Sequence, residues 1–341
     1  MSLNEKKINK LFINWLYCSF TIVFLIIIVG GLTRLTNSGL SITQWELFDG
    51  ILPPLNTKSW EVYFDLYKQI PQYELLNFNM NLDEFKIIFY WEYFHRMLAR
   101  LIGLFFLIPL IFFYLTKQIK KKDIYFCSLI FLFILFQGII GWYMVKSGLV
   151  HNITVSHYRL SIHLTTAIII ISMIFWLLKN LTSKKKKDFF RFSLKNLPFH
   201  LLVILIFFQI IIGAFVSGLD AGMIYQTWPK MGSTFIPNDL TFYNFLKIFD
   251  FDNHSLVQFY HRILAYFIIL YVIYLSTYIY KKKLDKLYAP LQILILFLSL
   301  QVLLGIFTLI SGLNIYLASS HQIIGVLLVL SVINLYYFAT K

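Results

Sequence analysis

Eight apolar segments, each about long enough to cross a bilayer, constrain this chain more than any other feature. They are residues 12–34, 92–115, 124–146, 155–179, 198–218, 257–280, 288–311 and 316–338. A membrane-spanning helix needs about 20 mainly apolar residues. The whole chain is 59% hydrophobic and 13% charged, whereas roughly a quarter of the residues in a soluble domain are charged. The sequence predicts an all-α membrane protein with eight transmembrane helices.

The placement of charge predicts the orientation of those helices. Lysine clusters at residues 6–7, 120–122, 184–187 and 281–283 fall in alternate connections, while acids outnumber lysines in residues 36–91 and 219–256. This is the positive-inside pattern, so we expect both termini in the cytoplasm and the two long connections outside. We expect the inner (plasma) membrane of a bacterium, with the first apolar segment as a span and not a cleaved signal. The net charge of +14 is explained by these loops, and nucleic-acid binding is not expected.

An internal repeat divides the chain into two halves of four helices. Several chemically similar positions recur in the same order in both halves: Glu92-Tyr-Phe-His95-Arg96-Met-Leu-Ala99 with Gln258-Phe-Tyr-His261-Arg262-Ile-Leu-Ala265, Gln137 and Gly141 with Gln301 and Gly305, Gly30 and Gly39 with Gly213 and Gly222, and His163 with His321. Four is an even number, so both halves enter the membrane from the same side and the repeat is parallel. We expect residues 1–183 and 184–341 to form two four-helix bundles.

Four histidines lie at similar depth in the even-numbered spans: His95, His163, His261 and His321. Each is followed four residues later, on the same helix face, by a small residue, namely Ala99, Ala167, Ala265 or Gly325. A small residue there leaves room for a flat macrocycle beside a ligating imidazole. Two such helices could bring their histidines to one iron from opposite faces, as in bis-histidine haem sites. Zinc is disfavoured because no third ligand joins either pair. The alternative is ordinary hydrogen-bonded intramembrane histidines.

Arginines at the same end of the spans are suited to the two propionates of a haem, since guanidinium binds carboxylate through paired hydrogen bonds. The candidates are Arg34, Arg96, Arg159 and Arg262, with Arg100 nearby. The alternative is interfacial snorkelling.

Glu92 precedes His95 by one turn and could handle protons beside a haem pocket, or it could form an i,i+4 ion pair with Arg96. Gln258, at the matching position, can do neither. We therefore expect chemistry in the N-terminal half and a resident redox haem in the C-terminal half.

The other histidines and the two long connections also lead to expectations. His157 lies on a different helix face from His163, and we expect it at the outer edge of a pocket. His151, His200 and His254 are expected to be ordinary solvated or interfacial residues. In the long connection 36–91, residues 60–89 are expected to form one or two interfacial helices carrying Trp60, Tyr63 and Phe64. Connections as long as this and 219–256 usually cap a site or carry function.

Together these segments resemble the haem A synthase family over nearly the whole chain. The resemblance is carried by Glu92-Tyr-Phe-His95-Arg96, Gly30-Gly-Leu-Thr-Arg34, Tyr158-Arg159-Leu-Ser-Ile-His163, Gly218-Leu-Asp-Ala-Gly222 with Thr227-Trp228-Pro229, Asn253 to Arg262, and His321-Gln322. It implies an eight-helix inner-membrane oxidoreductase that converts the C8 methyl group of haem O to the formyl group of haem A, for terminal oxidases. It also implies haem b between His261 and His321 in the C-terminal half. Haem O would then bind between His95 and His163, with Glu92 as the family's glutamate.

One departure from the family narrows the resemblance. Some members carry cysteine pairs in outer loops, whereas Cys18 and Cys127 both lie in apolar segments here. The chain therefore resembles the alphaproteobacterial and mitochondrial branch, which implies a ferredoxin-type electron donor and excludes a cysteine relay in those loops. Haem O synthase, cytochrome oxidase assembly and a possible homo-oligomer are the other expected partners. The alternatives are a dihaem b-type electron-transfer cytochrome acting as a quinol oxidoreductase, and a non-enzymatic haem carrier or transporter.

Overall fold

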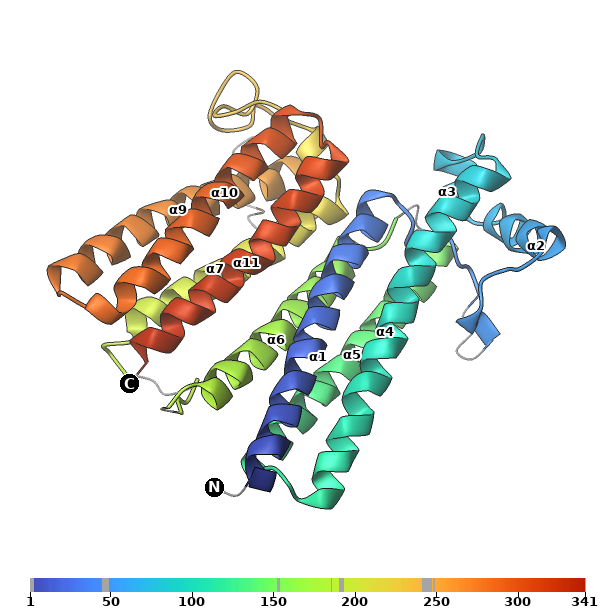
Figure 1. The fold of residues 1–341 in the computed structure, drawn as a ribbon. Helices are drawn as coiled ribbons and strands as arrows, with labels where there is room; N and C mark the ends of the chain where they lie inside the picture. The colour runs from blue at the N-terminus through green and yellow to red at the C-terminus, as the bar shows by residue number, and fades with distance from the viewer. Residues whose placement is uncertain are drawn as a thin grey trace. The chain divides into compact units, whose positions relative to one another are not determined.

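The structure is a computed structural model that describes residues 3–44, 49–151, 154–184, 186–189, 193–240, 247 and 249–340. In these residues eight helices are long and apolar enough to cross a membrane, which confirms the eight predicted spans (Figure 1). The long helices are α1 (Leu3–Leu35), α4 (Leu82–Thr116), α5 (Lys121–His151), α6 (His157–Thr182), α7 (Leu197–Gly218), α9 (His254–Lys281), α10 (Tyr288–Ile310) and α11 (Ile315–Ala339). The chain is an all-α, multi-pass membrane protein. The direction in which it crosses the membrane stays a prediction.

Local sequence signals explain where several helices begin. The Asn81 side chain accepts hydrogen bonds from the backbone N–H groups of Asp83 and Glu84, and the Glu84 side chain accepts one from the backbone N–H of Asn81. This capping box satisfies backbone donors that have no partner within the helix. Asn253 caps α9 in a similar way through Leu256 N, and Asn314 caps α11. Because α4 begins at Leu82, ten residues before the predicted span, it extends beyond the apolar segment.

The helices group into two compact units. The first comprises residues 1–159 and 169–174, and the second comprises residues 160–168 and 175–341, so α6 contributes to both. In the first unit α4 packs against α1 and α5. Trp15 Nε1 donates to Phe105 O at 3.0 Å and Thr33 Oγ1 donates to Trp91 O at 3.2 Å, which fixes α1 along α4. In the second unit α7 packs against α9 and α11, and α10 packs against α11.

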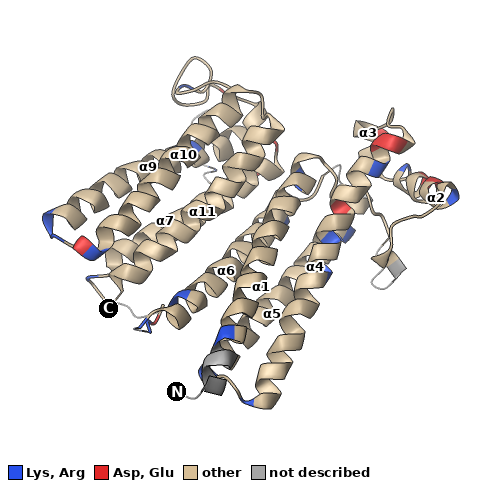
Figure 2. Cartoon of the chain, in the orientation of Figure 1, with Lys and Arg blue, Asp and Glu red and all other residues tan. Residues whose placement is uncertain are grey.

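Charged side chains gather at the helix ends and connections, and most of each long helix is uncharged (Figure 2). The exception is α4, whose first half carries Glu92, Arg96 and Arg100. Glu92 is 2% exposed. Buried ionisable groups inside a membrane-spanning helix are costly and usually functional, so this part of α4 is where a site is expected.

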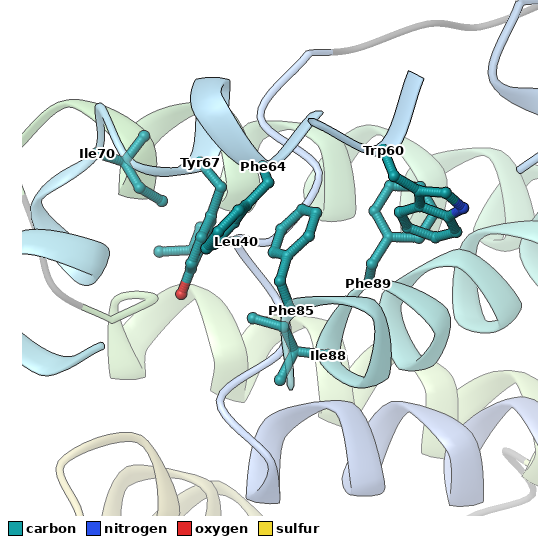
Figure 3. Packing of buried hydrophobic residues seen from close by; sticks show 8 residues of the cluster. All are labelled: Leu40, Trp60, Phe64, Tyr67, Ile70, Phe85, Ile88 and Phe89. Carbon is teal, nitrogen blue, oxygen red and sulfur yellow. The ribbon is translucent and has the colours of Figure 1, made fainter. Parts of the chain in front are cut away.

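The long connection after α1 folds into a small subdomain against the start of α4. It contains η1 (Asp49–Ile51), α2 (Thr57–Tyr67) and α3 (Pro71–Leu76). Its core is an aromatic and aliphatic cluster (Figure 3), whose buried members are Leu40, Trp60, Phe64, Tyr67, Ile70, Phe85, Ile88 and Phe89. Two helices form as expected, but the aromatic residues assigned to the membrane interface face this core. Trp60 is 7% exposed and Phe64 is 8% exposed, because α4 extends far enough to give them a partner.

Candidate functional site

His95 lies on α4 with its ring directly against the backbone of α1. A Cβ atom built on Gly30 of α1 would lie 2.7 Å from Cε1 of His95 and 3.2 Å from Nδ1. No side chain is tolerated at 2.7 Å, so the approach of the ring requires glycine at position 30. The structure thus gives a steric reason for a glycine that the sequence comparison of the two halves had singled out.

His261 makes the corresponding approach in the second unit. A Cβ atom on Gly213 of α7 would lie 3.0 Å from Cε1 of His261. One turn earlier on α7, Gln209 Nε2 lies 3.2 Å from Nδ1 of His261 and donates to the His261 backbone carbonyl at 3.0 Å. Gln209 and Gly213 therefore hold this imidazole from the same face of α7.

His321 on α11 is held by the same two residue types on α10. A Cβ atom on Gly305 would lie 2.9 Å from Cε1 of His321. Nδ1 of His321 lies 3.1 Å from the Gln301 backbone carbonyl, and Nε2 lies 3.2 Å from the Gln301 side-chain nitrogen. Since a carbonyl can only accept, the proton is on Nδ1 and Nε2 presents its lone pair. A hydrogen bond of this kind fixes the tautomer of a metal-ligating histidine.

One of the two predicted histidine pairs falls within a single unit, since His261 and His321 both belong to the second. Their joint binding of one iron stays a prediction. His95 belongs to the first unit, whereas His163 lies in the short part of α6 that belongs to the second. The pairing of His95 with His163 therefore stays a prediction.

The small residue one turn after His321 also has a defined neighbour. A Cβ atom on Gly325 would lie 3.3 Å from Gln301 Nε2, so this position adjoins the amide that faces the imidazole. That the small residues at i+4 make room for a macrocycle stays a prediction.

Glu92 is buried and fully engaged by hydrogen bonds. One carboxylate oxygen accepts from Ser41 Oγ at 2.7 Å and from the backbone N–H of Ile42 at 2.8 Å. The other accepts from Nε and Nη2 of Arg96 at 3.0 and 2.5 Å, and Arg96 also donates to the Ile42 carbonyl at 3.0 Å. The spacing-based ion pair with Arg96 is thus present. Together the two side chains fasten the connection after α1 to α4.

Gln258 and Arg262 fasten the connection after α7 to α9 in a related way. Gln258 Nε2 and Arg262 Nη2 both donate to the Tyr225 carbonyl, at 2.9 and 2.8 Å. Arg262 Nη1 donates to the carbonyls of Thr227 at 2.8 Å and Lys230 at 3.3 Å. Gln258 is 3% exposed. The same two positions of the repeat therefore hold a long connection in each half, once with a carboxylate and once without.

The other predicted arginines have partners of their own. Arg34 Nη1 donates to Asn37 Oδ1 at 2.9 Å, just after the end of α1. Arg159 donates to Ser147 Oγ and lies 4.7 Å above the ring of Tyr143. Arg100 donates to the Gly50 carbonyl at 3.4 Å. Contact of Arg34, Arg96, Arg159 or Arg262 with propionates stays a prediction.

The histidines outside the repeated set differ in environment. His254 is exposed at the start of α9, as expected. His157 is 7% exposed, with its ring 4.1 Å from that of Tyr158. His200 is not a solvated residue: it is half-buried, bonded to the Asn196 carbonyl at 3.0 Å and to the Tyr336 hydroxyl at 2.7 Å. The side chain of His151 lies outside the described residues.

Each of the two long connections contains a group whose pKa is shifted. Burial raises the pKa of Tyr67 against the effect of a hydrogen bond from Asn77, and the negative charge of Glu92 raises it further. The charge of Glu92 is therefore felt inside the aromatic cluster. In the other connection burial acts to raise the pKa of Asp239, but hydrogen bonds from Ser255 and from the Tyr225 hydroxyl hold it below its usual value.

Three residues that contact the site were not singled out as site residues from the sequence: Ser41, Gln209 and the Gln301 amide. Ser41 contacts Glu92 across about 50 residues of chain, and nothing local marks it. Gln209 and Gln301 do carry a signal, because each precedes a glycine by four residues (Gly213 and Gly305) on the helix beside a histidine. Comparing that spacing between α7 and α10 would have found both.

Comparison with known proteins agrees with these features. The model of the family described as cytochrome oxidase assembly protein matches residues 13–333. A protein named Heme A synthase from Pelagibacter ubique is 48% identical over 334 residues, covering 97% of both chains. Proteins of the same name from Rickettsia canadensis and Parvibaculum lavamentivorans are 41% and 45% identical, covering 98% and 76% of this chain, and 98% and 75% of their own.

The family expected from the sequence is confirmed by these matches, since the family model and two of the three relatives cover nearly the entire chain. By its sequence, the chain belongs to the cytochrome oxidase assembly protein family that includes these haem A synthases.

Proposed function

We propose that the protein is a haem A synthase, a membrane oxidoreductase that converts the C8 methyl group of haem O to the formyl group of haem A. The observation that carries the proposal is the identity of 48% over 97% of the chain to a haem A synthase. The arrangement of half-buried histidines against helix glycines supports it, because a catalyst acting on haem must bind a large flat group between helices.

The C-terminal unit is the proposed site of haem b, with His261 and His321 as the residues that would bind its iron. The donor set fits, because this unit supplies two half-buried imidazoles, each held by a glutamine of a neighbouring helix. Bound haem b supplies a one-electron carrier at this pair. Gln209 and Gln301 orient the two rings from α7 and α10, and Gly213 and Gly305 let the rings lie against those helices.

The N-terminal half is the proposed substrate site, with haem O between His95 and His163 and the chemistry beside Glu92. Glu92 stands one turn from His95 and is the buried acid of α4. Four hydrogen bonds, two of them from Arg96, hold its side chain in place. We propose that this fixed negative charge, next to the substrate, distinguishes the reactive half. The guanidinium groups of Arg34, Arg96, Arg159 and Arg262 are the proposed partners of propionates.

The proposed setting follows the charge pattern of the loops. Both termini lie in the cytoplasm, the two halves form a parallel repeat in the bacterial inner membrane, and the haem sites face the periplasmic side. A ferredoxin-type donor supplies electrons, haem O synthase supplies the substrate, and cytochrome oxidase assembly consumes the product. Assembly into a homo-oligomer is proposed with them.

Pigment extraction tests the function directly. The chain is expressed with a haem O synthase in a host that makes no haem A, and the haems are extracted and separated by chromatography. We expect haem A in the presence of the chain and haem O alone in its absence. Haem O alone in both cases, with the chain present in the membrane, would contradict the proposal and favour a haem carrier or an electron-transfer cytochrome.

A further inference from the structure

An apolar cavity of about 280 Å³ lies in the second unit, between the connection after α7 and the outer half of α9. Its lining residues come from these two segments: Pro229, Met231, Phe235 and Ile236 from the connection, and Phe259, Arg262, Ile263 and Tyr266 from α9. Phe259, Ile263 and Tyr266 recur at spacings of four and three residues, so they share one helix face. His261 points instead to Gly213 of α7. The cavity is therefore separate from the histidine site.

The position of the cavity along α9 places it at the edge of the hydrocarbon. α9 ends at Lys281 and is followed by two more lysines, which belong outside the bilayer core. About 20 helical residues cross that core, so counting back from Tyr280 brings its far boundary to about residue 261. Ile263 and Tyr266 then lie within the hydrocarbon, and Phe259 lies at its boundary.

The cavity continues a surface of α9 that faces lipid. Ile263 is 47% exposed, and the next apolar positions toward the other end of the helix, Phe267 and Leu270, are 51% and 65% exposed. On the connection, Phe235 and Ile236 are 66% and 50% exposed. Exposed apolar side chains on a membrane-spanning helix contact the acyl chains of the bilayer. The same contact extends from the flank of α9 into the cavity.

The first unit shows what the corresponding space looks like when the protein fills it. Tyr93, Arg96 and Arg100 of α4 match Phe259, Arg262 and Tyr266 of α9 in the repeat, and they line a cavity of about 20 Å³. There Tyr63 of α2 and Phe89 of α4 are also lining residues, supplied by the aromatic subdomain. In the second unit the connection contributes Pro229, Met231, Phe235 and Ile236 to the lining, and the space is still more than ten times larger.

We propose that this cavity binds one acyl chain of a membrane phospholipid from the adjoining leaflet. An apolar cavity of this size binds apolar molecules and excludes water, and the adjoining bilayer is the abundant source of hydrocarbon chains. Arg262 forms the polar edge of the site, since it donates to the carbonyls of Tyr225, Thr227 and Lys230 and holds the connection above the chain. Of the residues proposed to hold haem, only Arg262 also lines this cavity.

Photocrosslinking in nanodiscs tests this site. The full-length protein is reconstituted with a small fraction of phosphatidylcholine that carries a diazirine in one acyl chain, then irradiated and mapped by mass spectrometry. We expect crosslinks in the peptides that contain residues 229–236 and 259–266. Labelling is compared at single residues, because Phe94 beside Tyr93 is 53% exposed and will itself contact lipid. Few crosslinks are expected at Tyr93, whose cavity is filled. Equal labelling of Tyr93 and Phe259, or none at residues 229–236, would overturn the proposal.

Two substitutions separate a specific site from general exposure to lipid. Ile263→Trp fills the cavity and is expected to lower labelling of residues 229–236 by about tenfold, since added side-chain volume excludes the chain. Leu270→Trp adds the same bulk on the exposed flank and is expected to leave that labelling unchanged. Ile236→Trp fills the cavity from the connection and serves if Ile263→Trp is not recovered as monodisperse protein. Equal labelling in wild type and in the recovered filling variant contradicts the proposal.

A competition arm distinguishes the acyl chain from an isoprenoid tail. Excess haem O, which carries a hydrocarbon tail, is added before irradiation. Unchanged labelling of residues 229–236 supports a phospholipid site. Loss of labelling at those residues alone would assign the cavity to the substrate's tail and would overturn the proposal.

Discussion

Glu92 with Arg96 and Gln258 with Arg262 occupy matching positions, and each pair fastens the connection that follows the first long helix of its half. In the second unit a neutral amide and a guanidinium both donate to backbone carbonyls. In the first unit a carboxylate accepts from Ser41, Ile42 and Arg96. Fastening a connection therefore does not require a buried negative charge, because Gln258 does it without one.

The charge at Glu92 consequently needs another reason. Burying an ionised pair costs free energy in desolvation that is recovered only with good geometry and complete hydrogen bonding. Glu92 and Arg96 meet that condition, with side chains 3% and 11% exposed. A chain that could have used an amide here carries a charge instead. This comparison supports assigning chemistry to the N-terminal half more strongly than the sequence difference alone.

Replacing the histidines should have the largest effect, and the effect should differ between the two halves. His261→Ala or His321→Ala should abolish bound haem b, because each removes one axial ligand of the proposed site. His95→Ala should keep haem b while stopping haem A formation. The measurement is the reduced-minus-oxidised absorption spectrum of the purified protein. An intact haem b spectrum in His261→Ala would contradict the assignment of the halves.

Exchanging the acid and the amide should have the next largest effect. Glu92→Gln should keep haem b and stop haem A production, since the amide can still accept from Ser41 and Ile42 but carries no charge. The matched change, Gln258→Glu, should leave haem A production intact. Extracted haems are separated by chromatography and compared with protein content. Wild-type amounts of haem A from Glu92→Gln would remove the proposed role of the charge.

Substituting the glycines that face the imidazoles should lower haem b occupancy in one half and haem A yield in the other. Gly30→Ala, Gly213→Ala and Gly305→Ala each place a Cβ within 3.0 Å of a histidine ring carbon, and overpacking of this kind costs about 1–3 kcal/mol. Gly213→Ala and Gly305→Ala should lower haem b occupancy, and Gly30→Ala should lower haem A yield only. Gly138→Ala is the control, because its Cβ meets nothing within 4 Å. Equal effects of Gly138→Ala and Gly305→Ala would contradict the steric explanation.

Removing the hydroxyl of Ser41 tests whether its hydrogen bond to Glu92 stabilises the connection after α1 against α4. Ser41→Ala removes a donor to a buried carboxylate, which is worth about 1.5–3 kcal/mol of unfolding free energy. A lower thermal midpoint in detergent and a lower haem A yield are expected together. Thr21→Ala is the control, since that hydroxyl only bonds the Tyr17 carbonyl at an exposed position of its own helix. A midpoint equal to that of Thr21→Ala would count against the contact.

The smallest effect is expected from the carboxylate of the second connection. Hydrogen bonds hold the pKa of Asp239 below its usual value, so its charged form stabilises the fold above the unfolded-state pKa. That stability is lost as pH falls through the lower folded-state pKa. Asp239→Asn should reduce the difference in thermal midpoint between neutral and acidic pH, with no change in haem b content. A pH profile that matches the wild type would contradict this.

The sequence by itself determined the eight spans and the family. Hydrophobic runs of about 20 residues need no tertiary partner to be recognised, and the asparagine caps of α4, α9 and α11 depend on residues a few positions apart. The candidate histidines and the difference between Glu92 and Gln258 could also be read from the sequence, because aligning the two copies of a repeat shows where they differ.

Tertiary structure decided what those residues touch. Ser41 meets Glu92, Gly30 meets His95 and Trp60 meets Phe89 only because segments distant in sequence fold back on one another. Helical periodicity specifies which face a residue occupies but not which neighbour it meets. For the same reason the two connections could not be distinguished in advance: one packs aromatic side chains over its helix, and the other leaves a cavity there.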